Sequence, residues 1–371
     1  MTCASLARAL LMLTLALAPL AAPSPAQPSE EWERLIDLRG PWRFDIGDAP
    51  DRAEPEYDDG NWEALFVPAR WEDEGFFGYD GVAWYRKRVV IPADLAGRAL
   101  FLHLGRIDDI DEVYVNGLFV GRTGTWAPHY QTAYHVYRIY QLPADVLRFG
   151  EENVIAVRVY DHGLEGGILE GRIGIYENRA LPRFALDLAG RWQMQPGDDP
   201  AWRNTYGDKT AWTTVTVPAT WEPQGFDGYD GYAWYRKRFW VPEDIDPDDL
   251  VLMLGKIDDL DETFLNGRPI GHTGAIDEAR VEGHEWQIVR AYPVPPGLLR
   301  PGAYNTLAVR VYDGMIDGGI FEGPIGLVTR REAARWMERT PPPPDAPSST
   351  KGFWRWLWDR IDAPDGYHRR Y

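Results

Sequence analysis

The chain consists largely of two copies of one sequence unit, and this duplication limits its possible folds more than any other feature. The residues Gly-Tyr-Asp-Gly-Val-Ala-Trp-Tyr-Arg-Lys-Arg at 78–88 return 150 positions later at 228–238, and ten of the eleven are identical. The residues Ala-Val-Arg-Val-Tyr-Asp at 156–161 return at 308–313. A repeat of this length is typical of two similar globular domains rather than of a solenoid.

The length and composition agree with two domains and two extra ends. The chain has 371 residues, of which 44% are hydrophobic, so it can build packed cores. The predicted segments are a signal peptide at 1–26, a first domain at 27–182, a second domain at 183–332, and a helix, Pro-rich linker and Trp-rich tail at 333–371.

Each copy shows the pattern of many short β-strands. In 153–160, Ile155, Val157 and Val159 alternate with residues that point the other way, as in a strand with one buried face. Asn116-Gly117 lies between two apolar runs, which is a strong hairpin signal. Seven or eight such strands in about 145 residues predict an antiparallel sandwich or barrel.

The composition excludes several kinds of chemistry and partner. The only cysteine is Cys3, and no serine lies between Glu30 and Pro347, so this body has neither a cysteine nor a serine nucleophile. The net charge of −18 argues against nucleic acid as a partner. Carboxylate chemistry, or no chemistry, remains.

The N-terminus resembles a secretory leader. Arg8 precedes an apolar run at 9–17, and small residues follow up to a predicted cleavage after Ala26. We therefore expect an exported protein that is secreted, periplasmic or held in the cell envelope. The alternative is a retained N-terminal anchor, although the run is short for a membrane span.

The C-terminus combines a proline-rich linker at 340–350 with an aromatic segment at 351–361. On a helix, the large apolar side chains of this segment would form one stripe. They are Phe353, Trp354, Leu357, Trp358 and Ile361. This predicts docking to a membrane surface or a protein partner. The alternative is a short amphipathic helix that folds back onto the protein itself.

Several motifs together resemble the sugar-binding domain of glycoside hydrolase family 2. Each copy has a Val-Pro, a Trp-Tyr-Arg, an Asn-Gly hairpin, an Ala-Val-Arg-Val strand and a Gly-Gly-Ile in the same order over residues 37–330. The Ile-Asp-Asp and Gly-Gly-Ile segments are more similar still to the version attached to sialate O-acetylesterases. The resemblance implies an all-β fold of two tandem antiparallel jelly-roll β-sandwiches of the galactose-binding-like kind.

The resemblance also implies a carbohydrate-related role. Enzymes of the family carry a further sandwich and a catalytic barrel, for which we expect no room in this chain. We therefore expect a secreted carbohydrate-binding protein that is non-catalytic by itself and uses no cofactor. Two alternatives remain: a glycosidase that uses loop carboxylates, and an envelope scaffold that docks through the C-terminal tail.

The loop after the Ala-Val-Arg-Val strand is the best candidate for a sugar-binding rim, because it combines carboxylates with a tyrosine. Its candidates are Tyr160, Asp161, Glu165 and Glu170 in the first copy, and Tyr312, Asp313, Asp317 and Glu322 in the second. In the resembled enzymes a comparable loop lends an acid to the active site, which implies this role for Asp161 and Asp313. For the glycosidase alternative, the carboxylate pairs are Asp161 with Glu170 and Asp313 with Glu322. The alternative for these acids is that they cap turns or pair with Arg158.

Four aromatic residues in glycine-rich segments are further candidates for stacking on sugars. They are Trp71, Tyr79, Trp221 and Tyr229. Such side chains can equally fill the end of a sandwich, which we favour given the area that they bury.

Two acidic runs, at 108–112 and 258–262, offer oxygen ligands of the kind that calcium prefers. They lack the spacing and the glycine of a recognised calcium loop, so we expect turn and strand-edge caps and no metal. The histidines differ between the copies; for example, His103 corresponds to Met253, which argues against an imidazole role common to both.

Overall fold

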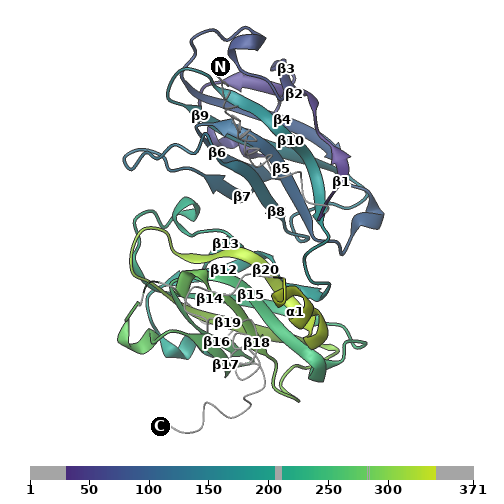
Figure 1. Ribbon diagram of the computed structural model, residues 1–371, viewed down its shortest axis with the longest axis vertical. Coiled ribbons are helices and arrows are strands. Elements are labelled where there is room, and N and C mark those ends of the chain that lie inside the picture. The colour runs from purple at the N-terminus through teal and green to yellow at the C-terminus, as the bar shows by residue number, and fades with distance from the viewer. Residues whose placement is uncertain (1–30, 205–210, 282, 284, 340–371) are drawn as a thin grey trace, which may run out of the picture.

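The computed structural model describes residues 31–204, 211–281, 283 and 285–339. Figure 1 shows two halves placed one above the other along the long axis of the molecule. The described residues form β-strands, short 3-10 turns and one α-helix, α1 (Arg330–Met337). None of the helical segments in this part of the chain is long and apolar enough to cross a membrane.

The first half contains ten strands in two antiparallel sheets. The six-stranded sheet has the order β3 (Glu63–Val67), β2 (Gly40–Ile46), β4 (Gly81–Val90), β9 (Glu152–Asp161), β6 (Ile110–Val115) and β7 (Leu118–Thr123). The four-stranded sheet has the order β1 (Trp32–Asp37), β10 (Gly167–Asn178), β5 (Leu100–Asp108) and β8 (Tyr137–Leu142).

The second half repeats this order strand for strand. Its six-stranded sheet is β13 (Thr213–Val217), β12 (Gly190–Pro196), β14 (Gly231–Val241), β19 (Ala303–Asp313), β16 (Leu260–Leu265) and β17 (Arg268–Thr273). Its four-stranded sheet is β11 (Phe184–Asp187), β20 (Gly319–Thr329), β15 (Leu250–Asp258) and β18 (Val289–Pro293).

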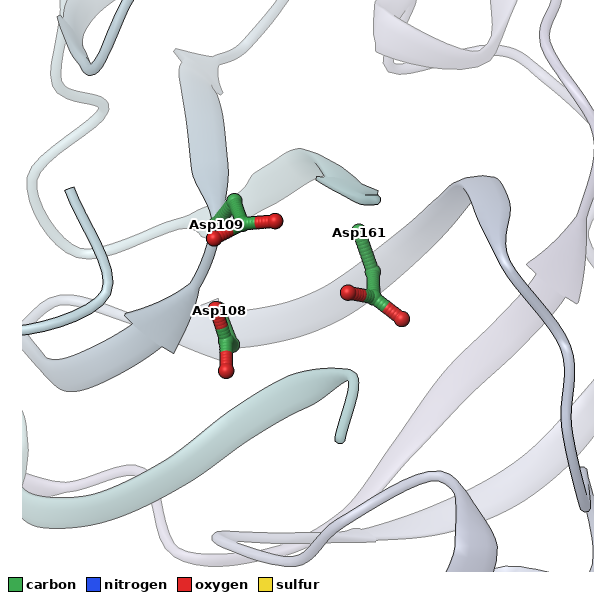
Figure 2. A group of neighbouring side chains, drawn as sticks. All are labelled: Asp108, Asp109 and Asp161. Carbon is green, nitrogen blue, oxygen red and sulfur yellow. The ribbon is translucent and has the colours of Figure 1, made fainter. Parts of the chain in front are cut away.

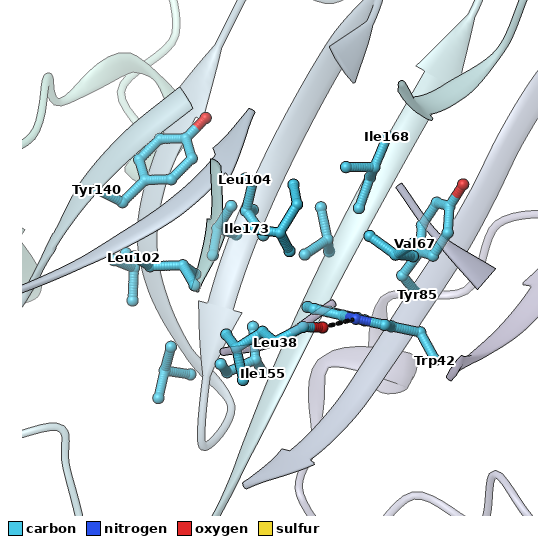
Figure 3. Close-up of a cluster of buried hydrophobic side chains, with 14 of the residues drawn as sticks. Leu38, Trp42, Val67, Tyr85, Leu102, Leu104, Tyr140, Ile155, Ile168 and Ile173 are labelled. Atoms are coloured by element: carbon cyan, nitrogen blue, oxygen red, sulfur yellow. Dashed lines mark hydrogen bonds between the residues drawn. The ribbon is translucent and has the colours of Figure 1, made fainter. Parts of the chain in front are cut away.

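Each half has its own hydrophobic core, to which both of its sheets contribute. In the first half, Trp42 from the six-stranded sheet and Leu102 from the four-stranded sheet belong to one buried cluster. Figure 3 shows this cluster and the hydrogen bond that the Trp42 indole donates to the Leu38 carbonyl, at 2.8 Å. The second core repeats the bond between Trp192 and Leu188 at 2.8 Å.

Periodicity explains the inner strands. The predicted alternation along β9 is confirmed, because Ile155, Val157 and Val159 all lie in the core. The predicted hairpin is also confirmed: Asn116 and Gly117 take φ values of 52° and 82° between β6 and β7. Two consecutive positive φ values are the signature of the turn that matches the twist of paired strands.

The expected fold class, two tandem antiparallel jelly-roll sandwiches, is wrong. The described chain is all-β, but it forms four small separate sheets of four and six strands, whereas a jelly roll has eight strands in all. The loop expected after the Ala-Val-Arg-Val strand, which was to carry Glu170, is also shorter than predicted. Residues 167–171 are not part of it. They are the beginning of β10, which stays paired to β5 by shifting register after Ile168 and again after Glu170.

The halves touch through a few polar contacts. The Thr216 hydroxyl donates to the Phe119 carbonyl at 2.7 Å, and the backbone N–H of Arg191 donates to Asp145 at 3.0 Å. The predicted leader at 1–26 and the aromatic tail segment at 351–361 lie outside the described residues. The division into domains therefore stays a prediction at both ends.

Candidate functional site

Three aspartates meet in each half where strands of its two sheets end. In the first half, Asp108 ends β5, Asp109 follows it, and Asp161 ends β9. One carboxylate oxygen from each lies within 4.8 Å of the others, and Figure 2 shows the three side chains facing one another. The second half repeats the group with Asp258, Asp259 and Asp313. We call these groups the first and second aspartate triads.

The surroundings of both triads disfavour ionisation of two of the three aspartates. Burial raises the pKa of Asp161 to about 6 and that of Asp313 to about 7. Burial, followed by the neighbouring aspartate, raises the pKa of Asp108 to about 7 and that of Asp258 to about 8. Both causes act against the ionised form of a carboxyl group.

Hydrogen bonds attach the following loop to the first triad. The backbone N–H of His162 donates to Asp109 Oδ2 at 3.0 Å, and that of Gly163 donates to Asp161 Oδ1 at 2.9 Å. The Thr132 hydroxyl also donates to Asp109. These bonds resemble the turn caps expected from the sequence, but they leave part of the triad unsatisfied, because Asp161 Oδ2 is buried with no hydrogen-bond partner in the described chain.

A buried ion pair beside each triad was missed by the sequence reasoning. The Arg138 guanidinium donates to Asp111 at 2.7 Å and to the Asp109 carbonyl at 2.9 Å, and both side chains are fully buried. In the second half, Arg290 and Asp261 repeat the pair at 2.9 Å. The sequence signal that could have found the pair is Arg-x-Tyr, which occurs in both copies. The tyrosines of this motif, Tyr140 and Tyr292, donate to the same aspartates as the arginines do.

The four candidate aromatic residues in glycine-rich segments lie in the cores or donate hydrogen bonds within their own turns. Trp71 and Trp221 are fully buried in the two cores. Tyr79 donates to the Val82 carbonyl at 2.6 Å, and Tyr229 donates to the Tyr232 carbonyl at 2.5 Å. Their hydroxyl groups therefore close turns within the protein.

The candidate glutamates lie apart from the triads and carry ion pairs. Glu165 pairs with Arg70 at 2.8 Å, and Glu170 pairs with Arg106 at 2.6 Å. In the second half, Glu322 pairs with Lys256 at 2.9 Å. Asp317 is partly exposed, on the loop after β19. The carboxylates that gather with Asp161 are thus Asp108 and Asp109 rather than Glu170. Arg158 pairs with Asp48 and Glu112.

An aromatic group borders the first triad, and we call it the aromatic rim. The Tyr160 ring lies 5.5 Å from the Trp126 ring and 6.0 Å from the Tyr130 ring, and Tyr130 lies 5.3 Å from His162. Tyr130 is 38% exposed. Of these residues, the sequence reasoning proposed only Tyr160.

The second half lacks most of this rim. Tyr312 packs on Tyr232 at 4.8 Å, while the positions of Trp126 and His162 are taken by Ile276 and Gly314. Ile276 is buried. The halves thus share the triad but differ in the surface around it.

A surface depression also lies at the junction of the halves. It is lined by Arg179, Leu181, Arg335, Trp336 and Arg339, among others. None of its lining residues belongs to either triad or to the aromatic rim.

Comparison with known proteins links part of the chain to glycosidases. No protein-family model matches the chain. The chain is 28% identical over 168 residues to the β-galactosidase BoGH2A of Bacteroides ovatus, which covers 42% of this chain and 19% of that protein. It is 30% identical over 131 residues to a β-glucuronidase of Formosa agariphila, which covers 32% of this chain and 12% of that protein.

Solved structures give weaker likenesses. A family 2 β-glucuronidase gives a TM-score of 0.35 at 17% identity, over 79% of this chain and 28% of that one. A β-galactosidase from Bacteroides fragilis, described as putative, gives 0.32 at 17%, over 77% and 36%. These scores carry no argument about function. By its sequence, part of this chain is homologous to glycoside hydrolase family 2 proteins, and it spans less than a fifth of the length of either curated relative.

Proposed function

We propose that this protein binds carbohydrate through the aromatic rim of its first half and does not cleave it. The observation that carries the proposal is the group of Trp126, Tyr130, Tyr160 and His162, which stands partly exposed beside an acidic group. Aromatic faces stack on the C–H groups of sugar rings, and polar groups beside them bind hydroxyls. The homology of part of the chain to glycosidases supports a carbohydrate-related role.

An exposed aromatic tip near the triad supports this placement. Phe77 is 82% exposed, and the backbone N–H of Gly166 donates to Glu72 at 3.4 Å, so the loop after Asp161 lies beside the segment of Phe77. The tip of that loop, Leu164, has φ 83° and is 92% exposed, but the equivalent Ile316 of the second half has φ 79° and is 80% exposed. The loop conformation is therefore common to both halves, and Phe77 is the tip that the second half lacks.

The geometry favours binding over hydrolysis. A glycosidase needs two carboxyl groups that a glycosidic bond can reach. Asp161 is fully buried, and Glu170 is engaged by Arg106. In the second half Asp313 is also fully buried, and Glu322 pairs with Lys256.

Export and docking are part of the same proposal. A carbohydrate-binding protein of this kind meets its ligand outside the cytoplasm, in agreement with the leader predicted at 1–26. N-terminal sequencing of the mature protein tests this, with Gln27 expected as the first residue. The finer resemblance to sialate O-acetylesterase accessory domains, and the docking role of the tail, remain hypotheses on sequence grounds alone.

The test is binding of the full chain to galactose, glucuronic acid and oligosaccharides that contain them, the sugars named by the relatives. We expect binding in the millimolar to micromolar range, and at least a tenfold loss of affinity in Tyr160→Ala. Tyr312→Ala is the matched control at the equivalent position and should bind like the unaltered protein. Folded protein that binds none of the panel at about 10 mM would contradict the proposal.

A further inference from the structure

The two aspartate triads leave a buried carboxylate oxygen without a partner. In the first, Asp161 is 0% exposed, and its Oδ2 atom accepts no hydrogen bond within the described chain. In the second, Asp313 is 0% exposed and its Oδ2 is also unpartnered. Burial of a polar group without a partner is costly and rare in folded proteins. Its repetition in both halves indicates a ligand that satisfies it.

The protein supplies no cation of its own to either triad. None of the six aspartates forms an ion pair within the part of the chain that the structure describes. The nearest guanidinium in the first half, that of Arg138, is directed at Asp111 and at the backbone carbonyls of Ala133 and Asp109. Arg290 does the same in the second half. Each triad therefore gathers three carboxyl groups with which no cationic side chain of the described residues forms an ion pair.

We propose that each half binds one divalent cation between the three carboxylates of its triad, and that calcium fits best. Calcium takes oxygen ligands at about 2.3–2.6 Å in flexible geometry, and carboxylates are among its usual ligands. One carboxylate oxygen from each aspartate of a triad lies within 4.8 Å of the others, close enough for one ion to contact all three. Magnesium demands near-ideal octahedral geometry and usually keeps several waters, so a group of three protein carboxylates suits calcium better. Water completes the coordination, since three carboxylates supply only part of the six to eight ligands.

The cation would join the two sheets of each half at one end. Asp108 ends β5 of the four-stranded sheet, and Asp161 ends β9 of the six-stranded sheet. Figure 2 shows the Asp161 carboxylate turned toward Asp108 and Asp109. The loop that carries Leu164 begins directly after Asp161, so the ion would also fix the base of this loop.

Calcium binding to the full chain, after removal of metal with a chelator, tests the proposal without any sugar. Isothermal calorimetry with CaCl2 at pH 7.5 should give two sites per chain. Asp161→Asn and Asp313→Asn should each leave one site, and the double variant none. Asp45→Asn is the control, because Asp45 pairs with Arg52 at 2.6 Å away from the triads, and it should retain both sites.

Thermal unfolding gives a second readout. Calcium should raise the melting temperature of the unaltered protein by several degrees, because a ligand that binds only the folded state stabilises it. With chelator present, Asp161→Asn should melt higher than the unaltered protein, because it removes an unpartnered buried charge. With calcium present the order should reverse. A merely structural role for Asp161 would lower the melting temperature in both conditions.

Several outcomes would overturn the proposal. One is folded protein that binds no calcium at about 10 mM, and another is a double variant that binds as much calcium as the unaltered protein. One site, lost in only one of the two variants, supports the proposal for that half and overturns it for the other. Should the variants fail to fold, Tb3+ emission from the unaltered protein decides, excited through Tyr130, whose phenol lies against Asp109. Added calcium should displace Tb3+ and lower this emission. Emission that stays unchanged when calcium is added would contradict the site.

Discussion

The two halves of the molecule share one strand order, but different side chains and segments cover the faces of their sheets. The outer face of the four-stranded sheet shows this at His103 and Met253, which occupy equivalent positions. His103 lies between Trp32 and Tyr176, with ring centroids 4.5 and 4.3 Å away. Met253 packs instead beneath helix α1, in a cluster with Ala333. The same sheet is therefore stable with either an aromatic cluster or a helix on its outer face, so the residues outside the two cores can differ between the halves without changing the strand order.

Other positions do not differ, and they show what the fold requires. A Cβ atom on Gly105 would stand 1.9 Å from the Glu170 carbonyl oxygen, and one on Gly255 would stand 1.7 Å from that of Glu322. The φ values of these glycines are 64° and 57°. Both contacts lie where β5 and β15 shift register against the neighbouring strand. The triads belong to this constant set, and the aromatic rim belongs to the variable set.

The largest effect should come from these glycines. Gly105→Ala and Gly255→Ala should each destabilise the protein by more than about 3 kcal/mol, because the backbone must move and φ is positive. Gly97→Ala is the control: it has φ 81° but nothing within 4 Å of the added atom, so it should cost only about 1 kcal/mol. Chemical denaturation measures all three. A tolerated Gly105→Ala beside a disruptive Gly255→Ala would show that the halves are not built alike.

The next effect is acid sensitivity confined to the first half. Burial, followed by the charge of Arg172, lowers the pKa of His103 from 6.5 to about 4. The folded state therefore loses stability as the pH falls from about 6.5 to about 4, by up to about 3 kcal/mol at 1.4 kcal/mol per pKa unit. His103→Met should remove this loss, and Met253→His should bring it into the second half. Melting temperatures at pH 4 and 7.5 measure the change. Equal acid sensitivity in His103→Met and the unaltered protein would contradict the account.

One carboxyl group of the second half, Glu222, should respond to pH in the direction opposite to His103. Burial raises the pKa of Glu222 from 4.5 to about 7. A raised pKa in the folded state means that stability is lost as the pH rises from about 4.5 to about 7. Glu222→Gln keeps an oxygen for the Gly318 N–H, which now lies 2.8 Å from the carboxylate. It should therefore stabilise the protein at pH 8, by at most about 3 kcal/mol, and change little at pH 4. An unchanged melting temperature at pH 8 would show that Glu222 ionises without cost.

The smallest effect concerns Phe77, an exposed tip outside the aromatic rim. Phe77 is 82% exposed, and its equivalent in the second half is the exposed Asp227. Phe77→Asp should reduce sugar affinity three- to tenfold, about 1 kcal/mol, without changing the melting temperature. Asp227→Phe should not create a second site, because the second half lacks most of the aromatic rim. Titration with the best ligand of the panel measures both variants, and an unchanged affinity in Phe77→Asp would move the site away from this loop.

Much of the fold could be predicted from the sequence, because a strand with one buried face shows alternating apolar and polar residues. The alternation along β9 and the Asn116-Gly117 turn follow from short-range rules. The beginning of β10, in segment 166–171, could not be recognised as a strand. Its glycines lie where the pairing with β5 shifts register, and from sequence alone such glycines cannot be told from those of a loop. The predicted loop after β9 was therefore too long.

The candidate site was less predictable because it is built from distant residues. The sequence reasoning treated the acidic run at 108–112 and the loop acid Asp161 separately. The fold brings Asp108, Asp109 and Asp161 together because the last residue of β5 lies close to the last residue of β9. Trp71 and Tyr79 were candidates from residue type and their glycine-rich segments, with a filling role favoured, and neither signal reveals that Trp71 donates its indole N–H to Tyr85 at 2.6 Å within the core.

The stoichiometry of glycan binding tests the central claim, that the two halves share a frame and differ in function. Native mass spectrometry of the full chain with the best ligand of the panel counts the bound molecules directly. We expect one glycan per chain, lost in Tyr160→Ala and kept in Tyr312→Ala. Two equivalent glycans per chain, or one that only Tyr312→Ala removes, would contradict it.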